Sequence, residues 1–300
     1  GSLTISGGTQ TLSGANTYTG TTTVSGGTLT LGNSNVLADT SALTVSGGTF
    51  AMGANSDTVA AVTLSAGSIT GAGGTLTGSS YSVTNSSGTT SISAILGGTS
   101  IALTKTGDGT LTLSGINTYT GSTTISAGTL ALSTAGAIAN SSGVANSGTF
   151  DISATTSGAS IITLSGAGGV NIAGKTLTIT NGSTTYSGVM SGASGNLTIS
   201  GGTQVLSGAN TYTGTTTVSG GTLSVTGSLS DSTAVAVSAG ATYNVGASDT
   251  IGALSGAGSV TLNANTLTIA TASGTYSGVM SGTGSLTISG GTQTLSGANT

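Results

Sequence analysis

The chain has 300 residues, of which 55 are Gly and only 3% are charged, and it contains no Pro, Cys, His or Trp. Its six Asp and two Lys give a formal net charge of −4, so it lacks a basic face that could neutralise phosphates, and nucleic acid is excluded as a partner. The absence of Cys excludes disulfides and thiolate metal sites. No apolar run approaches the roughly 20 residues of a membrane-spanning helix, so we expect no membrane insertion within this window.

Short stretches in which apolar residues alternate with Thr run through the whole chain. They begin with "LTIS" at 3–6 and "TLTL" at 28–31, and they include "TLTIT" at 176–180. A period of two is typical of β-strands, and the abundance of Val, Ile and Thr argues against disorder. We expect inward-facing side chains at Leu29, Leu31, Phe50, Met52, Tyr186 and Tyr276.

A recurring marker closes these stretches: an aliphatic residue followed by Ser, a small residue and Gly. The Gly suits a corner with positive φ. Strong and weak copies together give sixteen positions with a mean spacing of about 19 residues: Ile5, Val24, Val45, Leu64, Val83, Leu103, Ile125, Val144, Leu164, Ile179, Ile199, Val218, Val237, Leu254, Ile269 and Ile288. The pattern predicts an all-β fold, a parallel β-solenoid of about 16 coils of roughly 19 residues, stacked about 4.8 Å apart.

A longer repeat of about 90 to 100 residues contains five of these coils. The string "YSGVMSG" occurs at 186–192 and again at 276–282, and residues 1–17 recur identically at 284–300. We therefore expect residues 1–300 to form a single continuous solenoid, a window of a longer repeat protein. Its large repeats are predicted at approximately 1–101, 102–194, 195–283 and a truncated 284–300.

The most closely kept string is "LSGANTYTG" at 12–20, which returns at 206–214 and, as "LSGINTYTG", at 113–121. No copy carries an acid, a base or a ligand cluster, so we interpret the string as a structural corner. The glycines would serve the bends, Asn a turn or an asparagine ladder, and Tyr a wedge. The predicted corner residues are Gly14, Asn16, Tyr18, Gly20, Gly115, Asn117, Tyr119, Gly121, Gly208, Asn210, Tyr212 and Gly214.

An enzyme would need ionisable side chains close together, and this sequence scatters them. Asp57 and Asp249 occupy matching places in different large repeats, roughly 48 Å apart at strand spacing, and we expect each to accept backbone hydrogen bonds at a turn. Asp39 lies one coil from Asp57 but at a different place in the coil. Asp108, with Lys105 nearby, indicates a solvated turn. Because no His is present to activate Ser, we expect no catalytic, cofactor-binding or metal site.

Two surface alternatives stay open. Thr arrays could form a flat ice-binding face, and Tyr rings could stack on sugars, although one corner Tyr for every five coils is sparse. The candidate Thr-x-Thr pairs fall at several places within the coil: Thr9/Thr11, Thr21/Thr23, Thr28/Thr30, Thr75/Thr77, Thr110/Thr112, Thr176/Thr178, Thr215/Thr217 and Thr266/Thr268. A single uninterrupted face of these pairs is therefore not expected.

The stretch "GTLTLSGINTYTGSTTISAGTLAL" at 109–132 resembles the autotransporter-associated β-strand repeat, a Gly- and Thr-rich unit of passenger regions in very large bacterial surface proteins. Residues 1–31, 195–225 and 284–300 resemble it as well. The resemblance implies a right-handed β-helix that is exported and often displayed at the cell surface, anchored in the outer membrane by a part outside this window. It implies no particular activity.

We therefore expect a non-enzymatic, secreted or cell-surface structural protein, a stiff β-solenoid fibre or adhesin stalk. The first alternative is a carbohydrate- or ice-binding surface module, and the second is a polysaccharide-active enzyme. The expected partners are further copies of the chain, associating laterally or end to end, or a cell-surface or carbohydrate ligand. No cofactor is expected.

Overall fold

The computed structural model describes all residues 1–300. It contains no helix, and its strands pair in parallel with partners about one coil away in the sequence. None of its segments forms a helix with the length and apolar character needed to cross a membrane. The chain divides into two compact units, Gly1–Thr156 and Ser157–Thr300. The predicted all-β parallel solenoid with coils of about 19 residues is confirmed in each unit.

The first unit is built from β1 to β15. These strands are β1 (Leu3–Leu12), β2 (Thr22–Leu31), β3 (Leu43–Gly53), β4 (Asp57–Thr58), β5 (Ala61–Gly71), β6 (Thr75–Thr77), β7 (Ser80–Val83), β8 (Thr89–Ile92), β9 (Ile95–Gly97), β10 (Leu103–Lys105), β11 (Thr110–Leu113), β12 (Thr123–Ile125), β13 (Thr129–Thr134), β14 (Val144–Asn146) and β15 (Thr149–Thr155).

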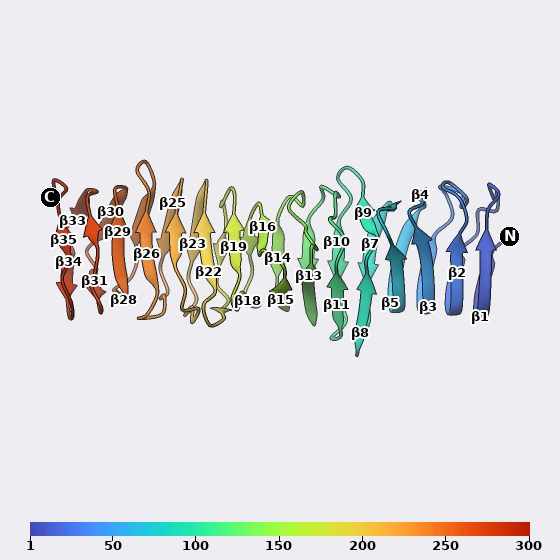
Figure 1. Ribbon diagram of the computed structural model, residues 1–300, viewed down its shortest axis with the longest axis horizontal. Helices are drawn as coiled ribbons and strands as arrows, with labels where there is room; N and C mark the ends of the chain where they lie inside the picture. The colour runs from blue at the N-terminus through green and yellow to red at the C-terminus, as the bar shows by residue number, and fades with distance from the viewer. The chain divides into compact units, whose positions relative to one another are not determined.

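The long strands of the first unit divide into two stacks after β5. Val62 of β5 pairs with Tyr81 of β7, whereas Ile69 of the same strand pairs with Ile92 of β8. The first stack continues through β7, β10, β12 and β14, and the second through β8, β11, β13 and β15 (Figure 1). A short third stack joins β4, β6 and β9. Each coil after β5 thus contributes one strand to the first stack and one to the second.

Two inward columns of side chains run through the first stack. The first follows the sequence marker, from Ile5 through Val24, Val45, Leu64 and Val83. The second lies two residues earlier in each coil and contains Leu3, Thr22, Leu43, Val62, Tyr81, Leu103, Thr123 and Val144. Fifteen of the sixteen predicted marker residues are buried, and Ile288 is 40% exposed. The other six predicted inward side chains, from Leu29 to Tyr276, are also buried.

The register corrects several of the marker assignments. Ile269 and Ile288 pair in a different stack, beside Ile251, whereas the column of Val237 continues through Gly256 and Tyr276. Leu103, Val144 and Leu254 lie in the column two residues before the marker, and the marker places in their coils are taken by Lys105, Asn146 and Gly256. The residue at the true marker place in these coils is not aliphatic. The nearest aliphatic residue in each of these coils is the inward residue of the second column, and the sequence pattern therefore identifies that residue as the marker.

The Gly that closes the marker has the predicted positive φ in most of the strong copies, although not at Gly48. Gly27 has φ 64° and Gly221 has φ 69°, in the left-handed region that favours glycine. Space is limiting as well, because a Cβ on Gly27 would lie 2.2 Å from the Gly8 carbonyl oxygen of the preceding coil. Both conditions select glycine at this corner.

The second unit is built from β16 to β35. These strands are β16 (Ala159–Ile161), β17 (Leu164–Ser165), β18 (Gly169–Asn171), β19 (Thr176–Ile179), β20 (Thr185–Tyr186), β21 (Met190–Ser191), β22 (Asn196–Ile199), β23 (Thr203–Leu206), β24 (Thr216–Val218), β25 (Thr222–Val225), β26 (Ala234–Val237), β27 (Thr242–Val245), β28 (Asp249–Ile251), β29 (Ala253–Gly256), β30 (Ser259–Asn263), β31 (Thr266–Ile269), β32 (Thr275–Tyr276), β33 (Met280–Gly282), β34 (Ser285–Ile288) and β35 (Thr294–Leu295).

Three parallel stacks organise most of the second unit (Figure 1). The longest runs β16-β19-β22-β24-β26-β29-β32-β35, the next β20-β23-β25-β27-β30-β33, and the shortest β28-β31-β34. In the centre of the longest stack, aliphatic residues of successive coils lie side by side, as in Ile199 beside Val218 and Val218 beside Val237. The predicted boundaries of the large repeats, and their joining into one continuous solenoid, stay predictions.

Candidate functional site

The closely kept string forms the connection between two stacks. Residues 113–121 lead from the end of β11 to the loop before β12, and residues 206–214 lead from β23 to the loop before β24. Residues 12–20 follow β1 in the same way and precede β2. We call these three segments the corner segments. Each lies where the chain leaves one coil and starts the next, so its side chains can reach the coils on both sides.

The Asn of the corner segment bonds to three successive coils. Asn117 Oδ1 accepts from the Leu96 amide at 2.9 Å, and its Nδ2 donates at 3.0 Å to the carbonyls of Gly115 and Ala137. Leu96 lies one coil earlier in the chain and Ala137 one coil later. One buried side chain therefore satisfies backbone groups of the previous, the same and the next coil.

The same bonds recur in the other corner segments. Asn210 accepts from the Met190 amide at 3.1 Å and donates at 3.0 Å to the carbonyls of Gly208 and Ser228. Asn16 donates at 2.8 Å to the carbonyls of Gly14 and Val36. The Asn position thus carries a repeated bridge between coils.

The hydroxyl of the Tyr in the corner segment forms a hydrogen bond with a buried Thr four residues later. The Tyr119 hydroxyl lies 2.7 Å from Thr123 Oγ1, which lies 2.9 Å from Ser141 Oγ in the next coil. Ser141 in turn donates to the Gly121 carbonyl at 2.9 Å. Burial raises the pKa of the Tyr119 hydroxyl well above its ordinary value, so it stays protonated.

Equivalent pairs occur in the other two segments, with Tyr18 2.8 Å from Thr22 and Tyr212 2.6 Å from Thr216. The rings of Tyr119 and Tyr212 are buried and Tyr18 is half-buried. Tyr119 and Tyr212 therefore offer no exposed face on which a sugar could stack. The partners Thr22, Thr123 and Thr216 were missed in the sequence, although a Thr four residues after each Tyr was the available signal.

Close approach of neighbouring coils explains the glycines of the corner segments. None of the six has a left-handed φ. A Cβ on five of them would lie between 2.0 and 2.6 Å from a carbonyl oxygen of the preceding coil; these are Gly20, Gly115, Gly121, Gly208 and Gly214. Gly14 has nothing within 4 Å of such a Cβ. At the five crowded places any side chain would push the coils apart.

Asp57 and Asp249 accept backbone hydrogen bonds, as predicted, but from the preceding coil instead of their own turn. Asp57 Oδ2 accepts from the amides of Val36 at 2.9 Å and Leu37 at 3.1 Å, and Asp249 Oδ2 accepts from Leu229 at 3.0 Å. Burial raises the pKa of both carboxyls, that of Asp249 to about 6. The acceptor role matches that of Asn117 and Asn210.

The solvated-turn interpretation is wrong for Lys105. Its side chain is fully buried in the marker column, between Val83 and Ile125, and its Nζ donates to the Gly107 carbonyl. Burial lowers the pKa of the amine, while Asp108 opposes that effect. Asp108 itself is exposed. No three Asp carboxylates come together in a way that could hold a metal ion.

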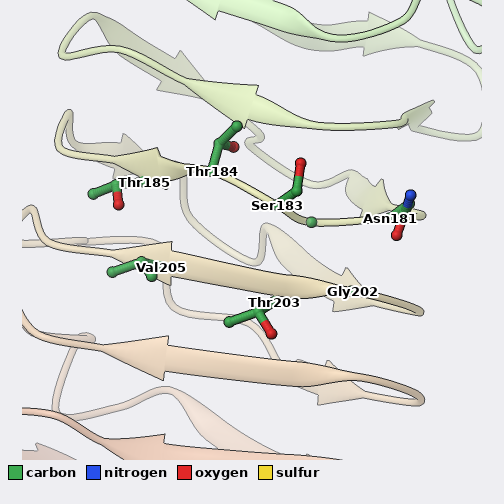
Figure 2. A pocket seen from close by; sticks show the side chains of 8 residues that line it. Asn181, Ser183, Thr184, Thr185, Gly202, Thr203 and Val205 are labelled. Carbon is green, nitrogen blue, oxygen red and sulfur yellow. The ribbon is translucent and has the colours of Figure 1, made fainter.

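A hollow of about 460 Å³ lies in the second unit beside β23. Figure 2 shows its wall: Asn181, Ser183, Thr184 and Thr185 on one coil, with Thr203 and Val205 on the next. These side chains offer neutral hydrogen-bonding groups and methyls, with no ionisable group and no aromatic ring. The lining thus contains neither a general acid nor a general base.

The comparisons with known proteins agree with this architecture. The passenger-associated-transport-repeat family matches residues 1–31, 103–132 and 199–225, and each match contains one corner segment. Three segments of the chain are thus similar to this repeat. It is also 34% identical, over an alignment of 126 positions, to the adhesin BmaC autotransporter of Brucella suis biovar 1 (strain 1330). That alignment covers 36% of this chain and 4% of the relative, so the chain spans a small part of that protein's length.

No solved structure matches the chain. The passenger repeats and the adhesin relative place it among secreted or cell-surface β-helical proteins of an adhesin-like, structural kind.

Proposed function

We propose that this chain is a stalk segment, a stiff spacer that holds a more distal part of a bacterial adhesin away from the cell surface. The relative is named an adhesin and an autotransporter. In this proposal the segment acts by its coils alone, without turnover of a substrate, and its anchor in the outer membrane lies outside these residues.

The bridging Asn residues support the proposal most directly. Asn117 and Asn210 each bond to three successive coils, in addition to the backbone ladders between the strands. A spacer under load needs each coil to be tied to its neighbours, since a solenoid is only as strong as its interfaces. The crowded glycines of the corner segments serve the same end, because they let the coil backbones approach closely.

A series of repeat lengths tests the stalk role. The protein would be displayed on its cell with one predicted large repeat, 195–283, deleted or duplicated, and the distance from a distal fluorophore to the outer membrane would be measured. Five coils at strand spacing should change this distance by about 24 Å in either direction. A distance that does not follow the number of repeats would contradict the proposal.

A further inference from the structure

A column of outward hydroxyl side chains runs beside the marker column of the first unit. The direct strand partners at the position before the marker are Thr4, Thr23, Thr44, Thr63, Ser82, Thr104 and Thr124. Seven successive coils therefore carry a hydroxyl at this place. The side chains are half-buried or exposed and point away from the core, because they alternate with buried residues.

A second column follows at the position after the marker, where every coil again carries a hydroxyl: Ser6, Ser25, Ser46, Ser65, Thr84, Thr106 and Ser126. From Ser65 onward these residues lie in register, since the amide of Thr84 donates to the Leu64 carbonyl, that of Thr106 to Val83 and that of Ser126 to Lys105. In the earlier coils a β-bulge shifts the pairing, so that Ser6 lies opposite Gly26 and Ser46 opposite Ala66. We call the two columns together the hydroxyl face. Where the two columns are in register, from Leu64 to Ile125, the hydroxyl groups repeat about every 4.8 Å between coils and about 6.6 Å along each strand.

Of the Thr-x-Thr pairs in the first unit, only Thr21/Thr23 contributes a residue, Thr23, to this face. Thr9 and Thr11 lie beside Thr28 and Thr30, but the next coil has Ala51 in the second place. Likewise Thr112 lies beside Ala131. The continuous array instead consists of the residues on either side of each marker, so the marker that defines the coil also defines the face.

The chemistry of the hydroxyl face argues against several classes of binding partner. It contains no charged residue, which leaves nothing to attract an ionic ligand. It contains no aromatic ring for stacking on sugars. Its two columns cover about 400 Å², half of the roughly 800 Å² that each partner usually buries in a stable protein complex. The hydroxyl face therefore lacks the groups that would bind a polysaccharide or a charged ligand, and it lacks the area that would bind a second protein.

The hydroxyl face is better suited to a crystalline solid, whose surface groups repeat at fixed distances. Thr side chains are stiff at χ1, and the backbone ladder fixes their spacing, so hydroxyls and methyls form a rigid two-dimensional array. Such an array holds its first layer of water at positions that repeat with the coils. The repeat distances of the hydroxyl face lie close to those of the water lattice in ordinary ice.

We propose that the hydroxyl face binds ice. The ordered water on the face would join a growing ice surface and attach the displayed chain to it. This function is separate from the stalk role, because it depends on the outward Thr and Ser side chains and not on the bonds between coils.

Two double variants test the proposal on the full chain. Thr23→Lys/Thr44→Lys places two charged side chains on the hydroxyl face. Thr28→Lys/Thr49→Lys places the same two charges on the same strands, β2 and β3, at outward and equally half-buried positions of the second stack. Circular dichroism would establish that both variants fold like the natural chain.

The measurement is uptake of purified chain into a slowly growing ice hemisphere, with insoluble cellulose and chitin as parallel surfaces. We expect the natural chain and the second-stack variant to enter the ice, and the hydroxyl-face variant to be excluded from it several-fold more strongly. Exclusion of the natural chain, equal behaviour of the two variants, or capture by the polysaccharides alone would overturn the proposal. None of these results would alter the dependence of surface distance on repeat number.

Discussion

At the scale of single residues, Asn and buried Asp side chains both accept hydrogen bonds from backbone amides of a neighbouring coil, but only Asn also donates one. Asn117 and Asn210 accept an amide from the coil before and donate to a carbonyl of the coil after. Asp57 and Asp249 accept amides from the coil before, but a carboxylate has no proton to donate. Asp57 Oδ1 is accordingly buried without a hydrogen-bond partner.

Replacing Asn117 with Ala should lower the free energy of unfolding by about 1–3 kcal/mol, because the buried Leu96 amide and Ala137 carbonyl lose their side-chain partner. Denaturant unfolding measures the loss, and hydrogen exchange at the Leu96 amide locates it. Asn140, which is exposed, provides the control, and its replacement by Ala should have little effect. Equal effects of the two substitutions would contradict the bridging role.

Asp249 should make the protein more stable in mild acid. Its pKa in the folded chain, about 6, lies above that of an unfolded Asp, so folding favours the protonated form. The stability linked to this group is fully present below the unfolded pKa and is lost as pH rises through about 6. Burial is the main cause, and the nearby Asp231 carboxylate adds to it.

The unfolding midpoint in denaturant, followed between about pH 4 and pH 7, should therefore fall as pH rises. Asp249→Asn should flatten this dependence, and adding Asp57→Asn should flatten it further because burial raises the pKa of Asp57 too. Asp231→Asn, at an exposed position, should leave most of the slope in place. A midpoint that rises with pH in the natural chain would show that the sign is wrong.

The hydrogen-bond partners of the corner Asn and the burial of Lys105 could not be predicted from the sequence. The spacing of "NTYTG" suggested an asparagine ladder, but not which backbone groups the Asn would reach, because those groups lie about 20 residues away in the chain. The interpretation of Asp108 and the nearby Lys105 as a solvated turn does not hold for Lys105, which is buried although a lysine usually avoids the core. Only the register shows that its place in the coil is that of an aliphatic residue.

At the scale of secondary-structure elements, the spacing between coils leaves no room for side chains at the corners. A Cβ on Gly208 would lie 2.0 Å from the Gly188 carbonyl oxygen, whereas a Cβ on Gly274 would lie 3.1 Å from the nearest atom, the Leu254 carbonyl oxygen. Neither glycine has a left-handed φ, so the comparison isolates the effect of space.

Gly208→Ala should therefore destabilise the protein by about 1–3 kcal/mol, since the overpacked coils must separate and lengthen their hydrogen bonds. Gly274→Ala should cost clearly less. Thermal unfolding of the two variants, followed by circular dichroism, provides the measurement. If both variants unfolded at the same temperature, close approach would not be the reason for glycine at the corner segment.

Strand positions were predictable from the sequence and strand partners were less so. The alternation in "TLTL" identifies inward Leu29 and Leu31, because a period of two belongs to a strand in any context. The assignment of Leu254 to the marker column failed, because two inward columns lie two residues apart and an aliphatic residue fits either. The hydroxyl face could not be predicted from the sequence, because its residues form a column only through the pairing of strands that lie about 20 residues apart in the chain.

At the scale of the whole chain, the paucity of basic residues and the burial of one of them predict resistance to trypsin. Lys105 and Lys175 are the only residues after which trypsin could cleave, and Lys105 is fully buried. The folded chain should therefore stay intact at Lys105 under conditions in which the denatured chain is cut there. Electrophoresis followed by mass spectrometry of the fragments checks this. Rapid cleavage of the native chain after Lys105 would show that the first unit opens readily.

The proposed stalk role requires that each coil be held to its neighbours. Pulling the full chain from its two ends with optical tweezers tests this requirement most directly. We expect resistance to force, followed by lengthening in discrete steps of one or a few coils, each coil of about 19 residues releasing roughly 60 Å. Smooth extension at low force, without steps, would contradict the account.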